Sequence, residues 1–212
     1  MKLSRKAMRL YAVTDRMWLG QNSLPEQVEE CIRGGATCIQ IREKDISFDE
    51  YVKLAIEIKK VTGKHDIPFI VNDDTDVAIA CKADGIHVGQ HDMQAGEVRK
   101  KAGGNMIIGV SAQNVEQAVL AEGMGADYIG VGAVFSTATK ADASDVTYET
   151  LKAICEAVSI PVVAIGGISK NNIMELKGSG ADGVAVVSAI FAQENIYEAA
   201  KELRALSDSC FG

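Results

Sequence analysis

The chain has 212 residues, of which 47% are hydrophobic and 24% charged, and its formal net charge is −7. This composition is that of a globular protein and not of a disordered chain. The acidic balance argues against general nucleic-acid binding but leaves anionic small molecules open. No apolar run reaches the roughly 18 residues of a membrane span, and the basic N-terminus has no signal-peptide core. Five cysteines without a CxxC pair indicate reduced thiols in a cytoplasmic protein.

A short unit recurs four times along the chain. In each copy a helical pattern ends in small residues, and a polar residue and an apolar run follow. Glycine after a helix is typical of a left-handed cap, and apolar runs without strict alternation are typical of parallel strands covered on both faces. The copies are "RGGATCIQI" (33–41), "CKADGIHVG" (81–89), "GMGADYIGVG" (123–132) and "GSGADGVAVV" (178–187).

The patterns between these copies complete eight expected strands separated by helices. Ser47 and Glu50 form a capping-box pattern at the start of one helix, and Pro25 suits the first turn of another. Eight strands each followed by a helix predict an α/β fold, a (β/α)8 TIM barrel formed by residues 1–212 as one domain. A doubly wound open sheet is disfavoured because "YAVTD" (11–15) has no glycine-rich first turn. The strands are expected at 9–14, 37–42, 67–72, 84–88, 106–110, 127–132, 161–165 and 183–187.

Polar residues cluster after the expected strands. In a (β/α)8 barrel the functional site forms at the C-terminal ends of the strands, and chance placement would scatter such residues over both rims. We therefore expect the site at this end. The polar residues are Gln40, Arg42, Lys44, Asn72, Asp73, Asp74, Asp92, Ser111, Thr137, Thr139, Lys140 and Ser188, and Gly166, Gly167 and Val187 lie beside them at the ends of the last two strands.

Glycine and serine after the last two strands indicate a phosphate site. Gly166, Gly167 and Ser169 are expected to open a helix, and Ser188 a short turn. Loops in these positions bind phosphate through backbone N–H groups, which glycine allows to approach closely. Either motif alone would favour a tight turn with a helix cap, but the two together favour phosphate binding.

Two carboxylates in the predicted loops are candidate metal ligands. Asp73 and Asp92 could hold Mg²⁺, which usually bridges to phosphate oxygens, or they could cap helices, and the local sequence leaves both open. Asp74 is expected to be a helix cap. His87 and His91 are four residues apart, but no HExxH pattern accompanies them and Gly89 interrupts any helix, so zinc is disfavoured.

Three cations complete the expected anion site. Arg42, Lys44 and Lys140 would neutralise a polyanion, since arginine grips phosphate as a fork and lysine acts as a point charge. Three cations and two carboxylates at one rim indicate Mg²⁺–diphosphate.

The chain resembles the thiamine phosphate synthase family over nearly its whole length. The resemblance rests on Gln40-x-Arg42-x-Lys44 and on "VNDD" (71–74), "DGIHVGQHD" (84–92), "GVSAQN" (109–114), "GADYIGVGAVFSTATK" (125–140), "PVVAIGGI" (161–168) and "VAVVSAI" (184–190). It implies a cytoplasmic transferase that joins hydroxymethylpyrimidine diphosphate to thiazole phosphate, giving thiamine phosphate and diphosphate.

The same resemblance implies roles for the rim residues. Arg42, Lys44, Lys140 and Ser111 are the expected catalytic group, in a reaction that needs no nucleophilic side chain. The implied partners are these small molecules, with no nucleic acid and no membrane, and a homo-oligomer is left open. By motif, the resemblance assigns Mg²⁺ to Asp73 and Asp92, the diphosphate to Arg42, Lys44, Asn72 and Lys140, the pyrimidine to Gln40 and Ser111, and the thiazole phosphate to Thr137, Thr139, Gly167, Val187 and Ser188.

The chain departs from the family in the loop after the sixth strand. The family usually has prolines there in a "GP...PT" pattern, whereas this chain has Ala133 and Ser136. Proline restricts a loop, so we expect altered loop behaviour and a retained site.

Three other functions compete with the synthase. A related thiazole tautomerase has a histidine near "GVSAQN", where this chain has Gln113. A catalytically silent precursor-binding relative would not need the diphosphate residues. A phosphosugar isomerase would need a general base such as glutamate or cysteine at a strand end.

Overall fold

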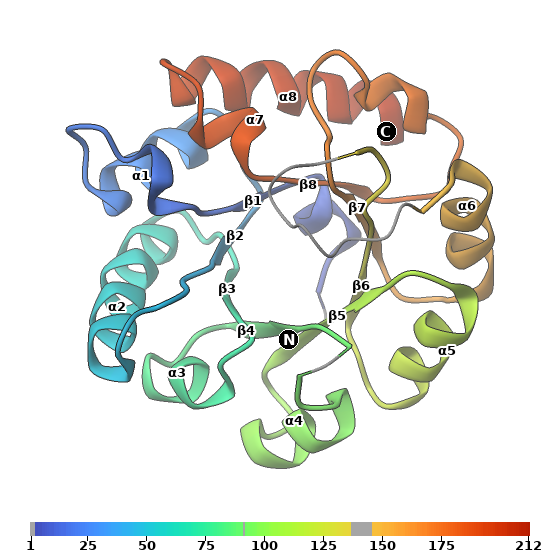
Figure 1. Cartoon of the computed structure of the whole chain (residues 1–212), viewed down its shortest axis with the longest axis horizontal. Helices are drawn as coiled ribbons and strands as arrows, with labels where there is room; N and C mark the ends of the chain where they lie inside the picture. Colours follow the sequence, from blue (N-terminus) through green and yellow to red (C-terminus); the bar gives the residue numbers. More distant parts are fainter. Residues whose placement is uncertain (1–2, 91, 137–145) are drawn as a thin grey trace.

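Eight parallel strands close into one barrel in chain order (Figure 1). The computed structural model describes residues 3–90, 92–136 and 146–212. The closing pair joins the first and last strands, with Leu10 opposite Val184, so the barrel prediction is confirmed and the open sheet is wrong. Each strand lies within two residues of its expected bounds: β1 (Leu10–Val13), β2 (Cys38–Ile41), β3 (Phe69–Asn72), β4 (Gly85–Val88), β5 (Ile107–Ala112), β6 (Tyr128–Val131), β7 (Val162–Ile165) and β8 (Gly183–Val186).

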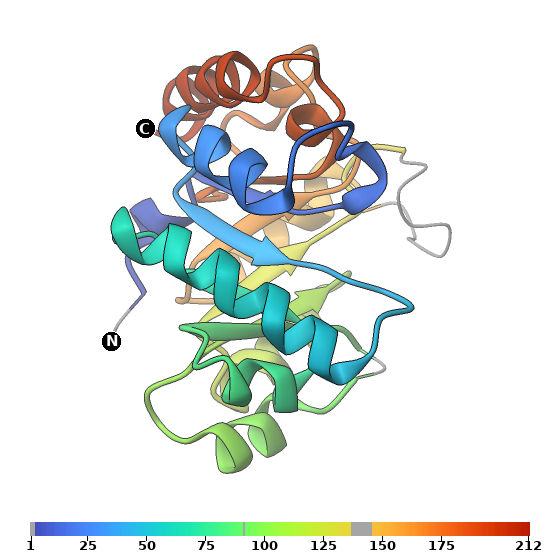
Figure 2. The ribbon, with the colours of Figure 1, turned by 90° about the vertical axis from the view of Figure 1, so that its left-hand side faces the viewer.

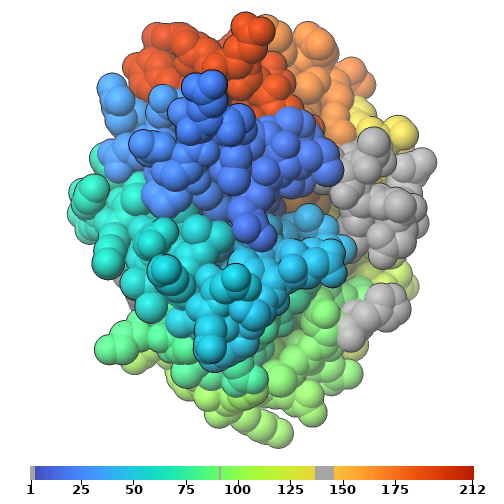
Figure 3. All heavy atoms as spheres, turned by 60° about the vertical axis from the view of Figure 1, so that its left-hand side comes forward, coloured from blue at the N-terminus to red at the C-terminus, as the bar shows by residue number. Residues whose placement is uncertain are grey.

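Helices surround the barrel as an outer ring (Figure 1). Turned by 90°, the loops that follow β1 and β2 lie at the end opposite the N-terminus (Figure 2). In the space-filling view the first half of the chain, blue to green, forms a closely packed face over α1 and α2 (Figure 3). Among the described residues, no helix is long and apolar enough to cross a membrane. The helices are α1 (Leu24–Arg33), α2 (Phe48–Lys64), α3 (Thr75–Ala80), α4 (Ala95–Ala102), α5 (Val115–Gly123), α6 (Tyr148–Ala157), α7 (Ser188–Phe191) and α8 (Ile196–Phe211), with 3₁₀ turns η1 (Arg5–Met8), η2 (Arg16–Trp18) and η3 (Ile173–Leu176).

The predicted helix starts are confirmed, with one exception. Ser47 and Glu50 form the capping box of α2, and Pro25 lies in the first turn of α1. After β7, however, no α-helix follows Gly167, so the expected helix there is wrong. The Asn172 side chain binds Ser169 N–H and Gly167 C=O, which holds a turn, and only the 3₁₀ turn η3 fits before β8 begins.

The fourfold repeat is explained by one recurring hydrogen bond at the N-terminal end of the barrel. The polar residue of each copy precedes an even-numbered strand and accepts the N–H of a residue at the start of the odd-numbered strand before it. Three of the four acceptors are aspartates that also bind a cation from elsewhere in the chain. The bonds are Leu10 N to Thr37 Oγ1 (2.9 Å), Phe69 N to Asp84 Oδ2 (2.9 Å), Ile108 N to Asp127 Oδ2 (2.8 Å) and Val162 N to Asp182 Oδ2 (2.9 Å), with Lys59, Arg99 and Arg5 as the cations.

Asp127→Ala is expected to lower the free energy of unfolding by about 1.5–3 kcal/mol, the range for hydrogen bonds to charged groups. The change removes both the Ile108 N–H bond and the 2.7 Å pair with Arg99. Denaturant unfolding measures the difference. The matched control is Glu202→Ala, whose pair with Lys170 is exposed on both sides and should be worth less than about 1 kcal/mol. Equal effects of the two changes would contradict this role for the repeat.

Strand side chains alternate between two apolar layers. Leu10 and Ala12 face the helices as part of the outer core, whereas Tyr11 and Val13 face the inside of the barrel. The inner core is completed by Met8, Cys38, Ile70, Ile107, Tyr128, Val163 and Ala185. The inward positions nearest the C-terminal strand ends are therefore the ones that line the expected site.

Candidate active site

The β2 end of the rim holds the expected amide and cations. Gln40 is buried, with 4% of its surface exposed, while Arg42 is half-buried and Lys44 is exposed. Thr14 fixes this strand end because its N–H donates to the Gln40 carbonyl (2.9 Å) and its Oγ1 accepts from Arg42 N–H (3.2 Å). The backbone of Arg42 is thus held at the rim.

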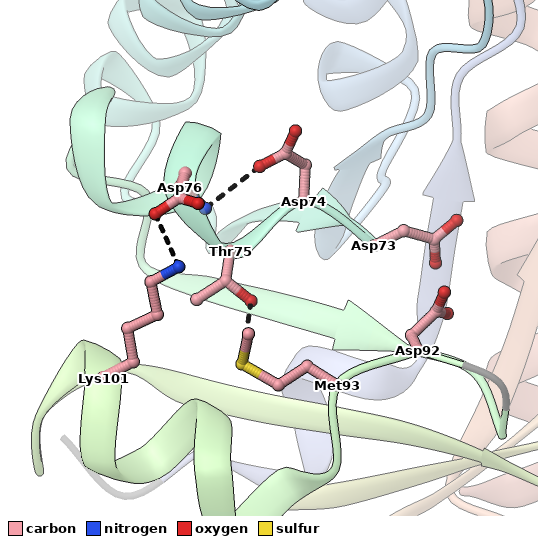
Figure 4. Close-up of a pocket in the computed structure, with 7 residues that line it drawn as sticks. All are labelled: Asp73, Asp74, Thr75, Asp76, Asp92, Met93 and Lys101. Carbon is pink, nitrogen blue, oxygen red and sulfur yellow. Dashed lines mark hydrogen bonds and ion pairs between the residues drawn. The ribbon is translucent and has the colours of Figure 1, made fainter.

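The two candidate metal ligands lie together. Asp73 and Asp92 line one hollow of about 410 Å³, and Figure 4 shows their carboxylates side by side. Desolvation in this hollow and the neighbouring Asp92 carboxylate raise the pKa of Asp73 to about 6, with Arg42 acting in the opposite direction. Two carboxylates that repel each other in this way are suited to sharing a cation.

Helix capping is wrong as an explanation for either residue. The N-cap of α3 is Asp74, whose side chain accepts from Asp76 N–H and Val77 N–H, as predicted. The N-cap of α4 is Gln94. Asp73 instead has a left-handed backbone (φ 62°), and Asp92 Oδ2 accepts from Gly89 N–H (2.7 Å). The left-handed conformation of a non-glycine residue is strained, and such strain is typical of functional sites.

The donor set fits Mg²⁺. Within residues 3–90, 92–136 and 146–212, no group of three or more histidine, cysteine or acidic side chains could hold a metal. Mg²⁺ needs only one or two carboxylates because it keeps several waters and takes substrate phosphate oxygens as its other ligands.

Sequence reasoning missed a partly buried partner of Ser111. His87 points into the barrel from β4, and its Nε2 lies 2.9 Å from Ser111 Oγ. On the other side its Nδ1 lies 2.9 Å from the Tyr128 hydroxyl. The strand alternation of Gly85-Ile86-His87-Val88 is the signal that could have placed His87 inside the barrel.

The expected phosphate residues lie at neighbouring strand ends, since β7 pairs with β8. Gly167 has a left-handed backbone (φ 63°), and Ser188 begins α7 directly after Val187. The loop after β6 is tied to the same place by Val134 N–H to the Ile165 carbonyl (3.0 Å) and Phe135 N–H to the Gly166 carbonyl (3.1 Å). Three expected site residues, Thr137, Thr139 and Lys140, lie outside the described residues, as does His91.

A second missed feature is a buried carboxylate between the two rim cations. The Glu43 side chain is 3% exposed, and its Oε2 lies 2.5 Å from Arg16 Nε. Its Oε1 is buried and has no hydrogen-bond partner among the described residues. Burial raises the pKa of Glu43, and Arg16 opposes that rise. The pair ties the loop after β1 to the loop that carries Arg42 and Lys44.

Arg16→Ala is expected to lower the free energy of unfolding by about 1–3 kcal/mol at pH 7, because it leaves the Glu43 carboxylate buried without its partner. The loss should shrink as the pH falls toward 4. The folded-state pKa of Glu43 is raised, so its unfavourable ionisation develops only as the pH rises through that pKa. Urea unfolding at several pH values measures this. In the double variant Arg16→Ala/Glu43→Gln the decrease in the free energy of unfolding should no longer depend on pH. If the pH-dependent decrease persists in the double variant, the explanation is contradicted.

The fold and the rim define a class. This is a (β/α)8 barrel whose C-terminal strand ends, where barrel enzymes have their active sites, carry a carboxylate pair together with cationic and glycine-rich loops. A family model described as thiamine monophosphate synthase matches residues 10–190, and the chain belongs to this family, whose members are transferases.

Individual relatives agree over most of the chain. A thiamine-phosphate synthase of Clostridium botulinum is 50% identical over 195 residues, which cover 92% of each protein. The thiamine-phosphate synthase of Ruminiclostridium cellulolyticum is also 50% identical, over 194 residues and 92% of each protein. The solved thiamine phosphate pyrophosphorylase of Pyrococcus furiosus is 40% identical, with a TM-score of 0.91 and coverage of 98% of this chain and 99% of that one.

Proposed function

We propose that this transferase couples hydroxymethylpyrimidine diphosphate with thiazole phosphate, with Mg²⁺ bound, to give thiamine phosphate and diphosphate. The observation that carries the proposal is the Asp73–Asp92 pair, whose carboxylates lie side by side at the rim that also carries Arg42. A tautomerase binds a single phosphate ester and has no use for this combination.

The diphosphate end of the site is assigned to charged and amide side chains. Arg42, Lys44, Asn72 and Lys140 hold the diphosphate, and Asp73 and Asp92 hold Mg²⁺. When bound, this ion neutralises charge that develops on the leaving group. The cations do the same from the protein.

The organic parts of the two substrates are assigned to the barrel mouth. Gln40 and Ser111 orient the pyrimidine, and Thr137, Thr139, Gly167, Val187 and Ser188 hold the thiazole phosphate. The bond between the pyrimidine methylene carbon and diphosphate breaks with its electron pair on diphosphate. The electron-rich aminopyrimidine supports the methylene cation, and the thiazole nitrogen then donates its lone pair to that carbon.

This reaction leaves no covalent task for a protein side chain. All five cysteines are free thiols, and burial raises the pKa of Cys31, Cys38 and Cys155, which makes each a poorer nucleophile. Positioning of the two substrates and stabilisation of charge therefore account for the rate. A cytoplasmic location, which suits free thiols, is part of the proposal.

The test is a coupled assay with the purified protein, both substrates and Mg²⁺, in which thiamine phosphate is measured by mass spectrometry. We expect product that depends on both substrates and disappears with a chelator. A folded protein that binds thiazole phosphate but forms no product would contradict the synthase and favour the tautomerase or the silent relative.

A further inference from the structure

A hydrogen-bonded chain runs through the inside of the barrel to Ser111. The Tyr11 and Tyr128 hydroxyls are 2.7 Å apart, the Tyr128 hydroxyl lies 2.9 Å from His87 Nδ1, and His87 Nε2 lies 2.9 Å from Ser111 Oγ. Tyr11 is 2% exposed and Tyr128 fully buried. This hydrogen-bonded chain thus connects the closed apolar core with a residue of the proposed substrate site.

The barrel interior is shaped around this chain. A side-chain carbon at Gly109 would overlap the phenol end of Tyr128, and one at Gly130 would lie 3.0 Å from His87 Cε1. Two inward positions on β5 and β6 are therefore glycine where the phenol and imidazole rings need the space. The tyrosine rings also pack on each other, with centroids 5.8 Å apart, and the His87 ring lies 5.5 Å from that of Tyr128.

Counting donors and acceptors gives the chain a direction. Burial raises the pKa of both tyrosines well above the ordinary value, so each hydroxyl keeps its hydrogen. In one direction Tyr11 donates to Tyr128, Tyr128 donates to His87 Nδ1, and the Nε2–H of His87 donates to Ser111 Oγ. Every buried hydrogen of the hydrogen-bonded chain then has an oxygen or nitrogen acceptor.

The reverse direction leaves the Tyr11 hydroxyl without a good acceptor. Tyr11 would then have to donate to the thiol of Cys38, a weak acceptor that lies among the apolar side chains of the inner core. A buried hydroxyl without a good acceptor is destabilising, so the first direction is favoured. In that direction the described residues use the Ser111 hydroxyl as an acceptor, so its own hydrogen can point to the barrel mouth.

We propose that Tyr128 and Tyr11 are positioning residues that act through His87 on Ser111. They hold His87 with its hydrogen on Nε2, so that Ser111 presents its own hydrogen to an acceptor atom of the bound pyrimidine substrate. The proposal rests on the proposed function for the identity of that substrate, but the direction of the chain does not depend on it.

A double-mutant cycle tests whether Tyr128 acts through Ser111. Tyr128→Phe keeps the ring and should lower kcat/KM for the pyrimidine diphosphate about tenfold, the effect of one lost hydrogen bond, without changing KM for thiazole phosphate. In a Ser111→Ala background the same change should have less than about a twofold effect. Equal losses in both backgrounds would overturn the proposal, because they would mean a general structural role.

Two further variants control for the removal of a hydroxyl. Tyr11→Phe leaves Tyr128 able to donate to His87, so its loss should be smaller than that of Tyr128→Phe. It also serves as the second variant where Tyr128→Phe lowers the melting temperature too far. Tyr148→Phe removes an exposed hydroxyl that binds the Lys177 carbonyl and should leave activity unchanged. If Tyr11→Phe lowers kcat/KM as much as Ser111→Ala does, the expected decrease in effect with distance from Ser111 is contradicted.

Nitrogen NMR of ¹⁵N-histidine-labelled protein tests the direction without any substrate. His87→Asn identifies the His87 signals among the three histidines. We expect hydrogen on Nε2 in the unmodified protein and a mixture of tautomers in Tyr128→Phe, and hydrogen on Nδ1 in the unmodified protein would overturn the proposal. A protein with Nε2–H but no synthase activity would refute the proposed function and leave the direction of the chain standing.

Discussion

Asp92→Asn is expected to lower kcat/KM for the coupling reaction on the order of 10²–10³-fold, the scale seen when one charge-stabilising group is lost from an active site. The change keeps the size of the side chain but removes one of the two carboxylates that lie side by side in the hollow. Because Mg²⁺ binds one or two protein carboxylates, the half-saturating Mg²⁺ concentration should also rise. Steady-state rates measured over a range of Mg²⁺ concentrations give both quantities.

The neighbouring Asp74 offers a matched control. Asp74→Asn removes one negative charge from the same hollow, but this side chain caps α3 and is not assigned to the metal. It should cost at most about 1 kcal/mol of stability and leave the Mg²⁺ dependence unchanged. Equal effects of the two variants on Mg²⁺ dependence would mean that the hollow acts only through its total charge, and the ligand assignment would fail.

The pH profile gives the Asp92 prediction a second check. Since the pKa of Asp73 is raised to about 6, this carboxylate is protonated below pH 6 and the half-saturating Mg²⁺ concentration should rise about tenfold per pH unit there. In Asp92→Asn the pKa of Asp73 should fall, because the neighbouring carboxylate is gone, and the break should move to lower pH. The free energy of unfolding without Mg²⁺ should change with pH in the opposite sense to Mg²⁺ binding. The raised folded-state pKa of Asp73 favours the folded protein at low pH, and this contribution is lost as the pH rises through 6.

The parts of the fold that were predicted are those with short-range signals. Apolar runs after helix ends with small residues located four strands, and the patterns between them located the other four. The rule that barrel sites lie at C-terminal strand ends placed Gln40, Arg42 and the Asp73–Asp92 pair at one rim. The repeated polar residue before the even strands was visible in the sequence, but its hydrogen bond to the preceding strand was not, because that bond needs the register of the sheet.

The missed features depend on contacts between distant residues. Glu43 looks like a solvated charge in the sequence, and only the position of Arg16 explains its burial. His87 and Tyr128 are 41 residues apart and meet only because β4, β5 and β6 are neighbours with the observed register. The wrong helix after β7 has a local cause, the Asn172 side chain, which competes with the helix for backbone hydrogen bonds.

Gly167→Ala is expected to lower kcat/KM for thiazole phosphate on the order of 10²-fold. Gly167 has φ 63°, which a side chain tolerates poorly, and an added Cβ would lie 2.5 Å from the Ser136 carbonyl oxygen and 2.8 Å from that of Phe135. These are backbone atoms, so the loop after β6 has to move as a unit away from β7. A shift of about 1 Å in a substrate-positioning segment is enough for an effect of this size. KM for the pyrimidine diphosphate should change less, because only Lys140 among its assigned residues follows β6 in the sequence.

Gly103→Ala separates this steric effect from the backbone strain. Gly103 also has a positive φ (83°), but an added Cβ there meets nothing within 4 Å, and the residue lies between α4 and β5, away from the rim. Both variants should lose about 1–3 kcal/mol of stability, because alanine tolerates a positive φ poorly. Only Gly167→Ala should lose affinity for thiazole phosphate in calorimetric titration. If the two variants bind thiazole phosphate equally well, the phosphate does not sit against Gly167. The loop after β6 would then have to hold it without the turn that follows β7.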